Sequence, residues 1–178
     1  MHISLALPRK ASENTFMPVY HILLHAYGTW HPGHPDGWHQ HGEGIHFRAQ
    51  PMLGKYRRAR QRWPSAKFSS NHQPALSDMA KDVCKRREWR CHAIAIDEIH
   101  IHIVVSWYTQ VPEAIEVQNT LKRLLGLQMV RLTSIRGRRW LSDGGLPKQV
   151  ADMEHLHYLL NEYLPNQGGY FWREPPRN

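Results

Sequence analysis

The stretch AIAIDEIHIHIVVSW, residues 93–107, decides how the chain folds, because its apolar residues alternate over a length typical of β-strands. The short break DE in its middle divides it into two runs, which predicts a β-hairpin. Side chains on a strand point to opposite faces in turn, so His100 and His102 share one face and Ile101 lies on the other. We therefore expect a strand with one apolar face and one face that carries two imidazoles.

Two imidazoles on the same face of a strand can bind one divalent ion. Their Cα atoms are about 6.5–7 Å apart, which allows the side chains to converge on a metal. The alternative is that His100 and His102 are ordinary surface residues, since the chain contains 14 histidines. Both interpretations stay open on this motif alone.

Elements of recognisable type lie on both sides of the hairpin. The pattern predicts a buried strand at 19–30, an amphipathic helix at 77–89, a second helix from Pro112 to near Gly137, a short strand at 138–141 and a last helix at 150–164. The order strand, helix, hairpin, helix, strand predicts a ferredoxin-like α+β sandwich, an antiparallel sheet with helices on one face. The histidines then lie on the uncovered face, where a substrate can reach them.

A chain of 178 residues is the size of one domain. Residues 1–17 look like a loosely ordered leader, and 18–178 form a single domain with an insertion at 31–72. The insertion is rich in Gly, Pro and His and is too long for an ordinary connection, so we expect it to be functional or disordered. Its histidines could bind a metal, but Gly and Pro between them give no fixed geometry: His31, His34, His39, His41 and His46.

The formal net charge is +8, and the chain holds seven Trp and seven Tyr. This combination suggests a polyanionic partner with flat rings, as nucleic acid has, while the charge by itself fits a merely basic soluble protein equally well. The candidate phosphate contacts are five residues of the insertion and two of the second helix: Lys55, Arg57, Arg58, Arg60, Arg62, Lys122 and Arg123.

Nothing in the sequence predicts a membrane or secreted protein. No apolar run approaches the roughly 18 residues needed to span a bilayer, and the first residues do not resemble a signal peptide. Cys84 and Cys91 are the only cysteines and lack metal-type spacing, so we expect a reducing cytoplasm.

Tyr163 and Gln167, in the segment YLPNQ, lie one helical turn apart on the last helix. A helix that carries both could deliver a nucleophile and a third metal ligand to one site, although a tyrosine beside a leucine stripe is more often part of a core. On an α-helix Tyr158 would point about 140° away from Tyr163, and Tyr170 follows two glycines beyond the expected helix end. Tyr163 is therefore the candidate nucleophile.

These motifs together resemble one known family. The motif His100-Ile101-His102, the spacing from Tyr163 to Gln167 and the stretch AYGTW at 26–30 are similar to those of HUH-superfamily transposases with a single catalytic tyrosine, which include insertion-sequence and REP-associated tyrosine transposases. The resemblance covers residues 19–167. It implies that His100, His102 and Gln167 bind a divalent metal and that Tyr163 attacks a phosphodiester of single-stranded DNA.

The resemblance further implies a metal-dependent single-strand DNA endonuclease and strand transferase that acts in DNA transposition through a 5′-phosphotyrosine. Its expected substrate is a DNA hairpin with a flanking single strand, and the protein can form a homodimer in which each tyrosine helix serves the partner's site. Neutral nitrogen and oxygen ligands suit Mn²⁺, or the Mg²⁺ that is available in cells.

Pro165 departs from this pattern, because it removes a backbone donor and its ring opposes the carbonyl of Asn161. The helix is expected to kink or stop before Gln167, which leaves Asn166 or Glu162 as fallback ligands. Two other functions fit the same residues. One is a non-catalytic ferredoxin-like nucleic-acid-binding protein, and the other is a metallonuclease that uses water and forms no covalent adduct.

Overall fold

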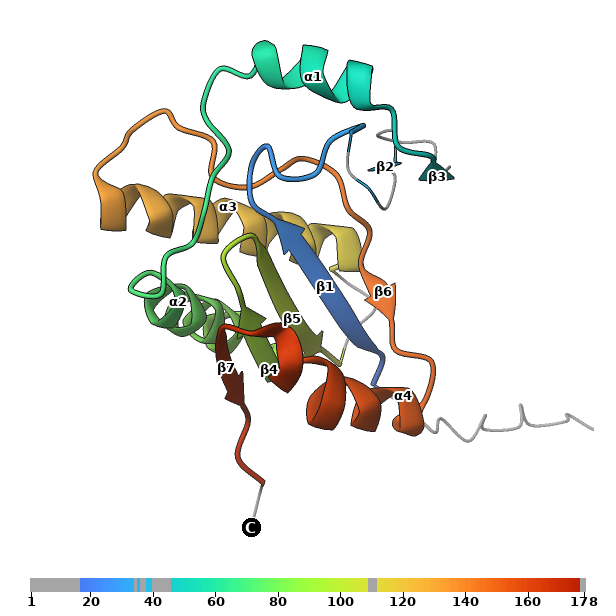
Figure 1. Ribbon diagram of the computed structural model, residues 1–178. Coiled ribbons are helices and arrows are strands. Elements are labelled where there is room, and N and C mark those ends of the chain that lie inside the picture. The colour runs from blue at the N-terminus through green and yellow to red at the C-terminus, as the bar shows by residue number, and fades with distance from the viewer. Residues whose placement is uncertain (1–16, 34, 36–37, 40–45, 109–111, 177–178) are drawn as a thin grey trace, which may run out of the picture.

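The computed structural model describes residues 17–33, 35, 38–39, 46–108 and 112–176, and its centre is a five-stranded antiparallel sheet (Figure 1). The elements of the expected core are β1 (Val19–His25), α2 (Gln73–Arg86), β4 (Arg90–Ile96), β5 (His100–Ser106), α3 (Ala114–Thr133) and β6 (Lys148–Gln149). The strand order β6-β1-β5-β4, with α2 and α3 on one face, is that of a ferredoxin-like sandwich. The predicted fold class and the predicted hairpin are confirmed.

The C-terminal segment adds a fifth strand and covers part of the second face of the sheet. It consists of α4 (Met153–Tyr158), a π-helix η1 (Leu159–Tyr163), a 3₁₀-helix η2 (Pro165–Gln167) and β7 (Tyr170–Arg173). β7 pairs with the outer edge of β4, and α4 and η1 cross in front of the sheet in Figure 1. The expected helix at 150–164 thus begins at Met153 and changes type after Tyr158.

Within the insertion, the structure describes a two-residue hairpin and one helix: β2 (Trp38–His39), β3 (His46–Phe47) and α1 (Pro51–Ala59). α1 lies beyond the end of β1, at the top of Figure 1. It packs closely on the loop after β1, since a Cβ at Gly54 would lie 2.5 Å from the amide nitrogen of Gly33. Residues 1–16 of the expected leader lie outside the described residues.

Two apolar layers hold the sheet. The larger layer, between the sheet and the helices α2 and α3, contains Ile22, Leu24, Ile101, Ile103, Leu76, Val83, Leu121 and Leu125. The second, between the sheet and the C-terminal segment, contains Val19, Ala93, Ala95, Val104, Leu156, Leu159, Leu160 and Leu164. The histidine face was expected to be uncovered, and this expectation is wrong: its small and branched residues give the C-terminal leucines a surface to bury. No helix in the described part of the chain is long and apolar enough to cross a bilayer.

The strand expected at 138–141 is also wrong. Only Leu141 forms a bridge to the end of β1, and the strand beside β1 is instead β6. Between this bridge and β6, Gly144 and Gly145 adopt positive φ angles of 77° and 82°, which glycine tolerates, and the chain changes direction there. Lys122 of α3 donates to the carbonyl of Gly144 at 2.7 Å and holds this turn in place.

Two contacts attach the end of the C-terminal segment to the sheet. Buried Gln73, at the start of α2, donates to the carbonyl of Phe68 and accepts the amide of Tyr170, each at 3.0 Å. Gly169 lies so close to β4 that an added Cβ would come within 2.0 Å of the carbonyl oxygen of Ile96. The absence of a side chain at Gly169 therefore allows the segment to pack where it does.

Gly169→Ala should destabilise the protein by about 1–3 kcal/mol, because the new methyl group can only be accommodated if the backbone of β4 or β7 moves. Gly126→Ala is the matched control, since Gly126 lies inside α3 and a methyl group added there would meet nothing within 4 Å. That change should stabilise the protein by about 0.5–1 kcal/mol through helix propensity. Urea unfolding followed by circular dichroism measures both, and equal effects of the two changes would contradict the close packing at Gly169.

Candidate active site

The pairing of β1 with β5 brings histidines of both strands to one face of the sheet. His25 lies directly opposite His100, and His21 lies opposite Val104, diagonal to His102. The rings of His25 and His100 are 5.0 Å apart between centroids, and those of His100 and His102 are 5.9 Å apart. The two histidines of the sequence motif thus belong to a cluster of four.

His102 is the buried member of this cluster, with 2% of its surface exposed. Its Nδ1 lies 3.1 Å from Nε2 of His21, within hydrogen-bond distance, and the two rings are stacked. Its Nε2 is buried and has no hydrogen-bond partner among the described residues. A buried polar atom without a partner is costly, so this nitrogen is a good candidate for a ligand atom.

His100 is oriented by a carboxylate in the hairpin turn. Its Nδ1 lies 2.9 Å from Oδ2 of Asp97, while Oδ1 of Asp97 accepts the amides of Ile99 and His100 at 2.6 Å each. Burial alone would raise the pKa of Asp97, but these hydrogen bonds lower it, and the carboxylate stays charged. A carboxylate bonded to one ring nitrogen of a histidine is the usual support for a metal-binding imidazole.

Each motif histidine has one ring nitrogen engaged within the protein and one that a divalent cation could use. Nδ1 of each lies within hydrogen-bond distance of another side chain, which leaves Nε2 of each as the candidate ligand atom. The described residues contain no group of three or more His, Cys, Asp or Glu that could hold a metal ion. Gln167 does not complete such a site as it stands, because its side-chain amide donates to the carbonyl of Tyr163 at 2.9 Å. The fallback ligands Asn166 and Glu162 are both exposed, and the Asn166 amide bonds to the Glu162 carbonyl.

Tyr163 lies against the histidines. The centroid of its ring is 5.6 Å from that of His102 and 5.9 Å from that of His21. The π-helix also brings Tyr158 to 6.1 Å from Tyr163, although an α-helix would separate the two. In a π-helix hydrogen bonds join residues five apart, as Leu164 to Leu159 does here, so residues five apart lie on the same side. The expected divergence of the two tyrosines is wrong for this reason.

The helix changes type next to Pro165, as its missing N–H and its ring predict. The amide of Leu164 bonds to Leu159 rather than to Leu160, and a 3₁₀-helix follows from Pro165. The predicted break before Gln167 is confirmed.

Burial controls the charge of the site. It lowers the pKa of His21 to about 4, with Lys148 and His155 adding to the effect, and lowers the pKa of His102 to about 3, with His21 adding to it. Both imidazoles are therefore neutral at neutral pH, as metal binding requires. Burial also raises the pKa of Tyr163, with contributions from Tyr158 and Asp97, so its hydroxyl is protonated in the resting protein.

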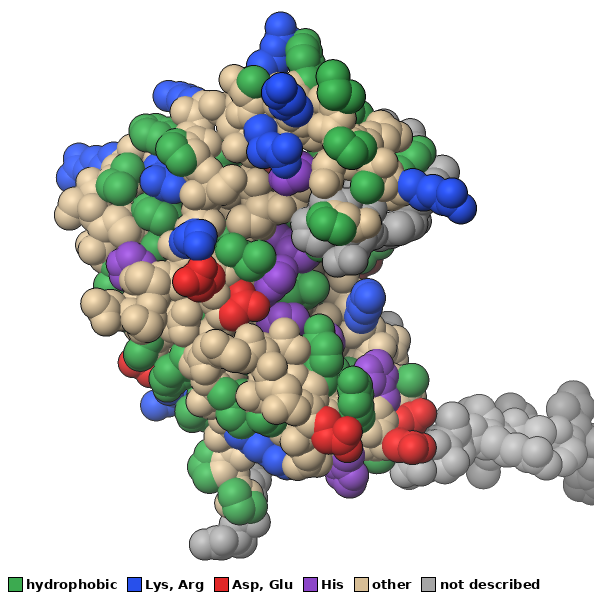
Figure 2. All heavy atoms as spheres, viewed as in Figure 1, with side chains coloured by type: hydrophobic (Ala, Val, Ile, Leu, Met, Phe, Trp, Pro, Cys, Tyr) green, Lys and Arg blue, Asp and Glu red, His purple; other side chains and the backbone are tan. Residues whose placement is uncertain are grey.

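Figure 2 shows histidine side chains gathered in a hollow of this face of the molecule, with Lys and Arg side chains above them. The five predicted contacts of the insertion are all exposed on or just after α1: Lys55, Arg57, Arg58, Arg60 and Arg62. Arg58 donates to His31 at 2.6 Å and Arg60 lies over the ring of Tyr56. Lys122 and Arg123 belong to α3, on the opposite side of the sheet from the histidines.

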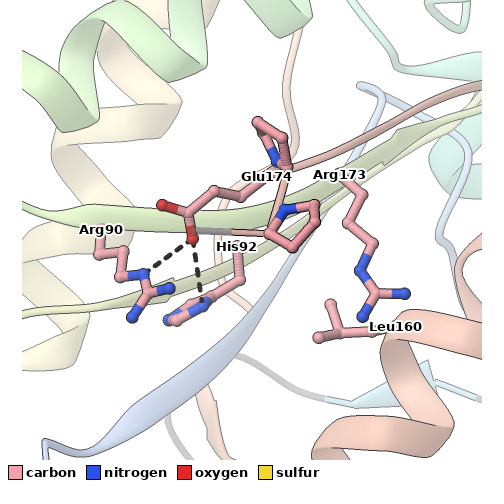
Figure 3. Close-up of a pocket in the computed structure, with 7 residues that line it drawn as sticks. Arg90, His92, Leu160, Arg173 and Glu174 are labelled. Atoms are coloured by element: carbon pink, nitrogen blue, oxygen red, sulfur yellow. Dashed lines mark hydrogen bonds and ion pairs between the residues drawn. The ribbon is translucent and has the colours of Figure 1, made fainter. Parts of the chain in front are cut away.

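A separate cavity of about 590 Å³ lies between β4, β7 and η1, shown in Figure 3. Its lining residues are Arg90, His92, Leu160, Arg173, Glu174, Pro175 and Pro176. Arg90 pairs with Glu174 at 2.8 Å, and Arg173 donates to Asn161 at 2.7 Å. These contacts link the last strand to β4 and to the π-helix, so they help to hold Tyr163 in position.

Four residues of the site were not identified from the sequence: His21, His25, Asp97 and Lys148. A signal for the first two was present, because the stretch VYHILLH places them four residues apart on one face of a strand. Lys148 lies opposite His21 in the β1–β6 register. That pairing depends on where β6 begins, which the local sequence pattern did not indicate.

The buried histidines predict acid sensitivity of the metal-free protein. In the unfolded chain they take up protons near pH 6.5, and in the folded protein only near pH 4 and 3, so the unfolded state binds more protons in between. The free energy of unfolding should therefore fall as the pH falls from about 6.5 to about 4. Urea unfolding across this range should give a shallower pH dependence for His21→Phe than for the wild type. His157→Phe, which removes an exposed histidine, should keep the wild-type dependence; equal slopes for all three proteins would contradict the buried neutral state.

No family model and no curated protein matches the chain. Among solved structures, the chain is similar to a crystal structure at 1.90 Å resolution from Deinococcus radiodurans R1, described there as a candidate transposase. The two share 12% identity over 92% of this chain and 100% of that chain, with a TM-score of 0.47.

Proposed function

We propose that this protein is a DNA transposase that cleaves and rejoins single-stranded DNA with Tyr163 as nucleophile. The observation that carries the proposal is the contact of Tyr163 with His102, at 5.6 Å between ring centroids, although 61 positions separate them in the chain. Packing in the second apolar layer does not by itself require a tyrosine to contact a buried imidazole. His102 is such an imidazole, and its Nε2 has no hydrogen-bond partner among the described residues. Such an arrangement suits phosphoryl transfer to a phenol, because it places a hydroxyl-bearing side chain beside a candidate metal ligand.

In the proposed reaction the Oη atom of Tyr163 attacks the phosphorus of a phosphodiester in line with the 3′ oxygen. The phosphorus–oxygen bond to that 3′ oxygen breaks, a 3′-hydroxyl leaves with the proton, and the downstream strand stays attached through a 5′-phosphotyrosine. Because a phenol has a pKa near 10, its oxygen leaves more readily than an alkoxide, so a 3′-hydroxyl can reverse the step and join strands. The reaction needs neither water nor ATP.

His100 and His102 are the residues that would hold a divalent cation, Mg²⁺ or Mn²⁺, through their Nε2 atoms. When bound, the cation supplies positive charge that polarises the scissile phosphate. Neutral ligands leave that charge intact, and Asp97 supports it from behind His100. Gln167 would join as a third ligand if its side chain left the carbonyl of Tyr163, a change of side-chain rotamer.

Tyr163 contacts His102 of its own chain in the described structure, and the homodimer with exchanged tyrosine helices stays a prediction. The same hollow suits an unpaired strand. The exposed cations of α1 can contact phosphates along one wall, and exposed Tyr56, on the same helix, offers a ring on which a base can stack.

The nucleophile is tested with a 3′-labelled hairpin substrate that carries a single-stranded flank. The wild type should give a denaturation-resistant protein–DNA adduct that retains the label, and Tyr163→Phe should abolish the adduct while DNA binding persists. Tyr158→Phe and Tyr170→Phe should retain it, because neither ring contacts the histidine pair in the described structure. A chelator or His100→Ala should prevent the adduct, and manganese or magnesium should restore the chelated wild type.

An adduct that maps by peptide mass to Tyr158 or Tyr170 would overturn the assignment of Tyr163. Cleavage without any adduct would identify a metallonuclease that uses water instead. Binding without cleavage, with or without metal, would leave a non-catalytic nucleic-acid-binding protein.

The proposed phosphate contacts of the α1 region are tested by the double variant Lys55→Ala/Arg62→Ala. If both side chains contact phosphates, the slope of log K against log salt should become shallower by about 1.4, at roughly 0.7 per contact on a single strand. The matched control is Lys85→Ala/Arg87→Ala, which removes the same charge from exposed positions at the end of α2. Fluorescence anisotropy at several salt concentrations measures both, and equal slopes for the two variants would exclude a specific role for the α1 region.

A further inference from the structure

His21 is the neighbour of His102 that the proposed reaction does not use. It lies in the middle of β1, and the β1–β5 register makes it the diagonal neighbour of His102 on the same face. The two rings are stacked, with centroids 5.3 Å apart and planes at 19°, and Nε2 of His21 lies 3.1 Å from Nδ1 of His102.

A hydrogen bond between two neutral imidazoles has a direction, because one nitrogen must carry the proton and the other must accept it. If Nδ1 of His102 donates, its Nε2 carries a lone pair and can bind a metal. If Nδ1 accepts instead, Nε2 carries the proton and cannot bind one. His102 therefore binds a metal only when His21 accepts through Nε2 and holds its own proton on Nδ1.

We propose that His21 is a positioning residue that accepts the Nδ1–H of His102 and thereby keeps the Nε2 lone pair of His102 directed at the metal. This inference rests on the proposed function. His21 would do for His102 what Asp97 does for His100, so each ligand has its own acceptor on the far side of the ring. The difference is that His21 is a neutral acceptor and adds no charge beside the buried ligand.

The same contact reaches the nucleophile. The ring of Tyr163 forms a T-shaped contact with both His21 and His102, with an interplanar angle of 76° in each case. A displaced His21 would therefore disturb the tautomer of the ligand and the position of the phenol together.

Three variants test this role. His21→Phe keeps a flat ring but has no acceptor, His21→Gln can place its Oε1 near the position of the lost Nε2, and His157→Phe removes an exposed histidine as control. Calorimetric titration with Mn²⁺ should show a roughly 10–100-fold weaker affinity for His21→Phe, as is typical for loss of such a support. His21→Gln should recover most of the loss, and His157→Phe should bind like the wild type.

The second measurement needs no metal and no activity. Long-range ¹H–¹⁵N correlation spectra of the metal-free protein report which ring nitrogen of His102 carries the proton. The wild type and His21→Gln should show the proton on Nδ1, whereas His21→Phe should show a mixture of both tautomers. Because the wild-type spectrum already carries the prediction, the test stands even if His21→Phe fails to fold.

The outcomes separate this inference from the proposed function. Wild-type protein that binds Mn²⁺, together with equally tight binding by His21→Phe, would overturn the role of His21 and leave the metal site standing. A proton on Nε2 of His102 in the metal-free wild type would also overturn it. Wild-type protein that binds no Mn²⁺ would remove the metal site, and the role of His21 with it.

Discussion

The antiparallel pairing of β1 with β5 is the constraint on which the rest of the molecule depends. Seven residue pairs lock the two central strands in one register. Since side chains alternate, this register sends Ile22, Leu24, Ile101 and Ile103 into the layer beneath α2 and α3 and the histidines to the other side. A slip of one strand by one residue would turn its two histidines into this apolar layer and its two large aliphatic residues to the other face, so the apolar layer protects the geometry of the site.

The C-terminal segment packs beside the histidines because their face of the sheet also carries apolar residues. Ala93, Ala95 and Val104 provide a shallow apolar floor, and the leucines of α4 and η1 bury themselves on it. The α-helix gives way to a π-helix after Tyr158, Pro165 opens a 3₁₀-helix, and the chain then pairs with β4. The π-helix turns both Tyr158 and Tyr163 to one side, and the close contact of Gly169 with Ile96 fixes where the segment ends.

The site buries polar groups, two imidazoles and a phenol, and their burial determines their protonation. Desolvation keeps His21 and His102 neutral, which costs stability in acid and provides lone pairs that a cation can use. The same desolvation raises the pKa of Tyr163, so its phenol is protonated in the described structure. Under the proposed function, a cation held by His100 and His102 would supply the charge that stabilises the phenolate.

Local pattern determined the ferredoxin-like order, the hairpin at residues 93–107 and the shared face of His100 and His102, because strand alternation and helical periodicity are properties of neighbouring residues. It also pointed to Tyr163 as the candidate nucleophile, which stays a prediction, and to the effect of Pro165, since the ring and missing donor of proline act on the adjacent turn. The partnership of His21 with His102 was decided only by tertiary structure, because 81 positions separate them and the register of β1 depends on both apolar layers at once. Tertiary structure also decided two other features. A turn with two positive-φ glycines sets the position of β6, and the packed leucines of the C-terminal segment set the contact of Tyr163 with His102. Neither feature leaves a periodic signal in the sequence.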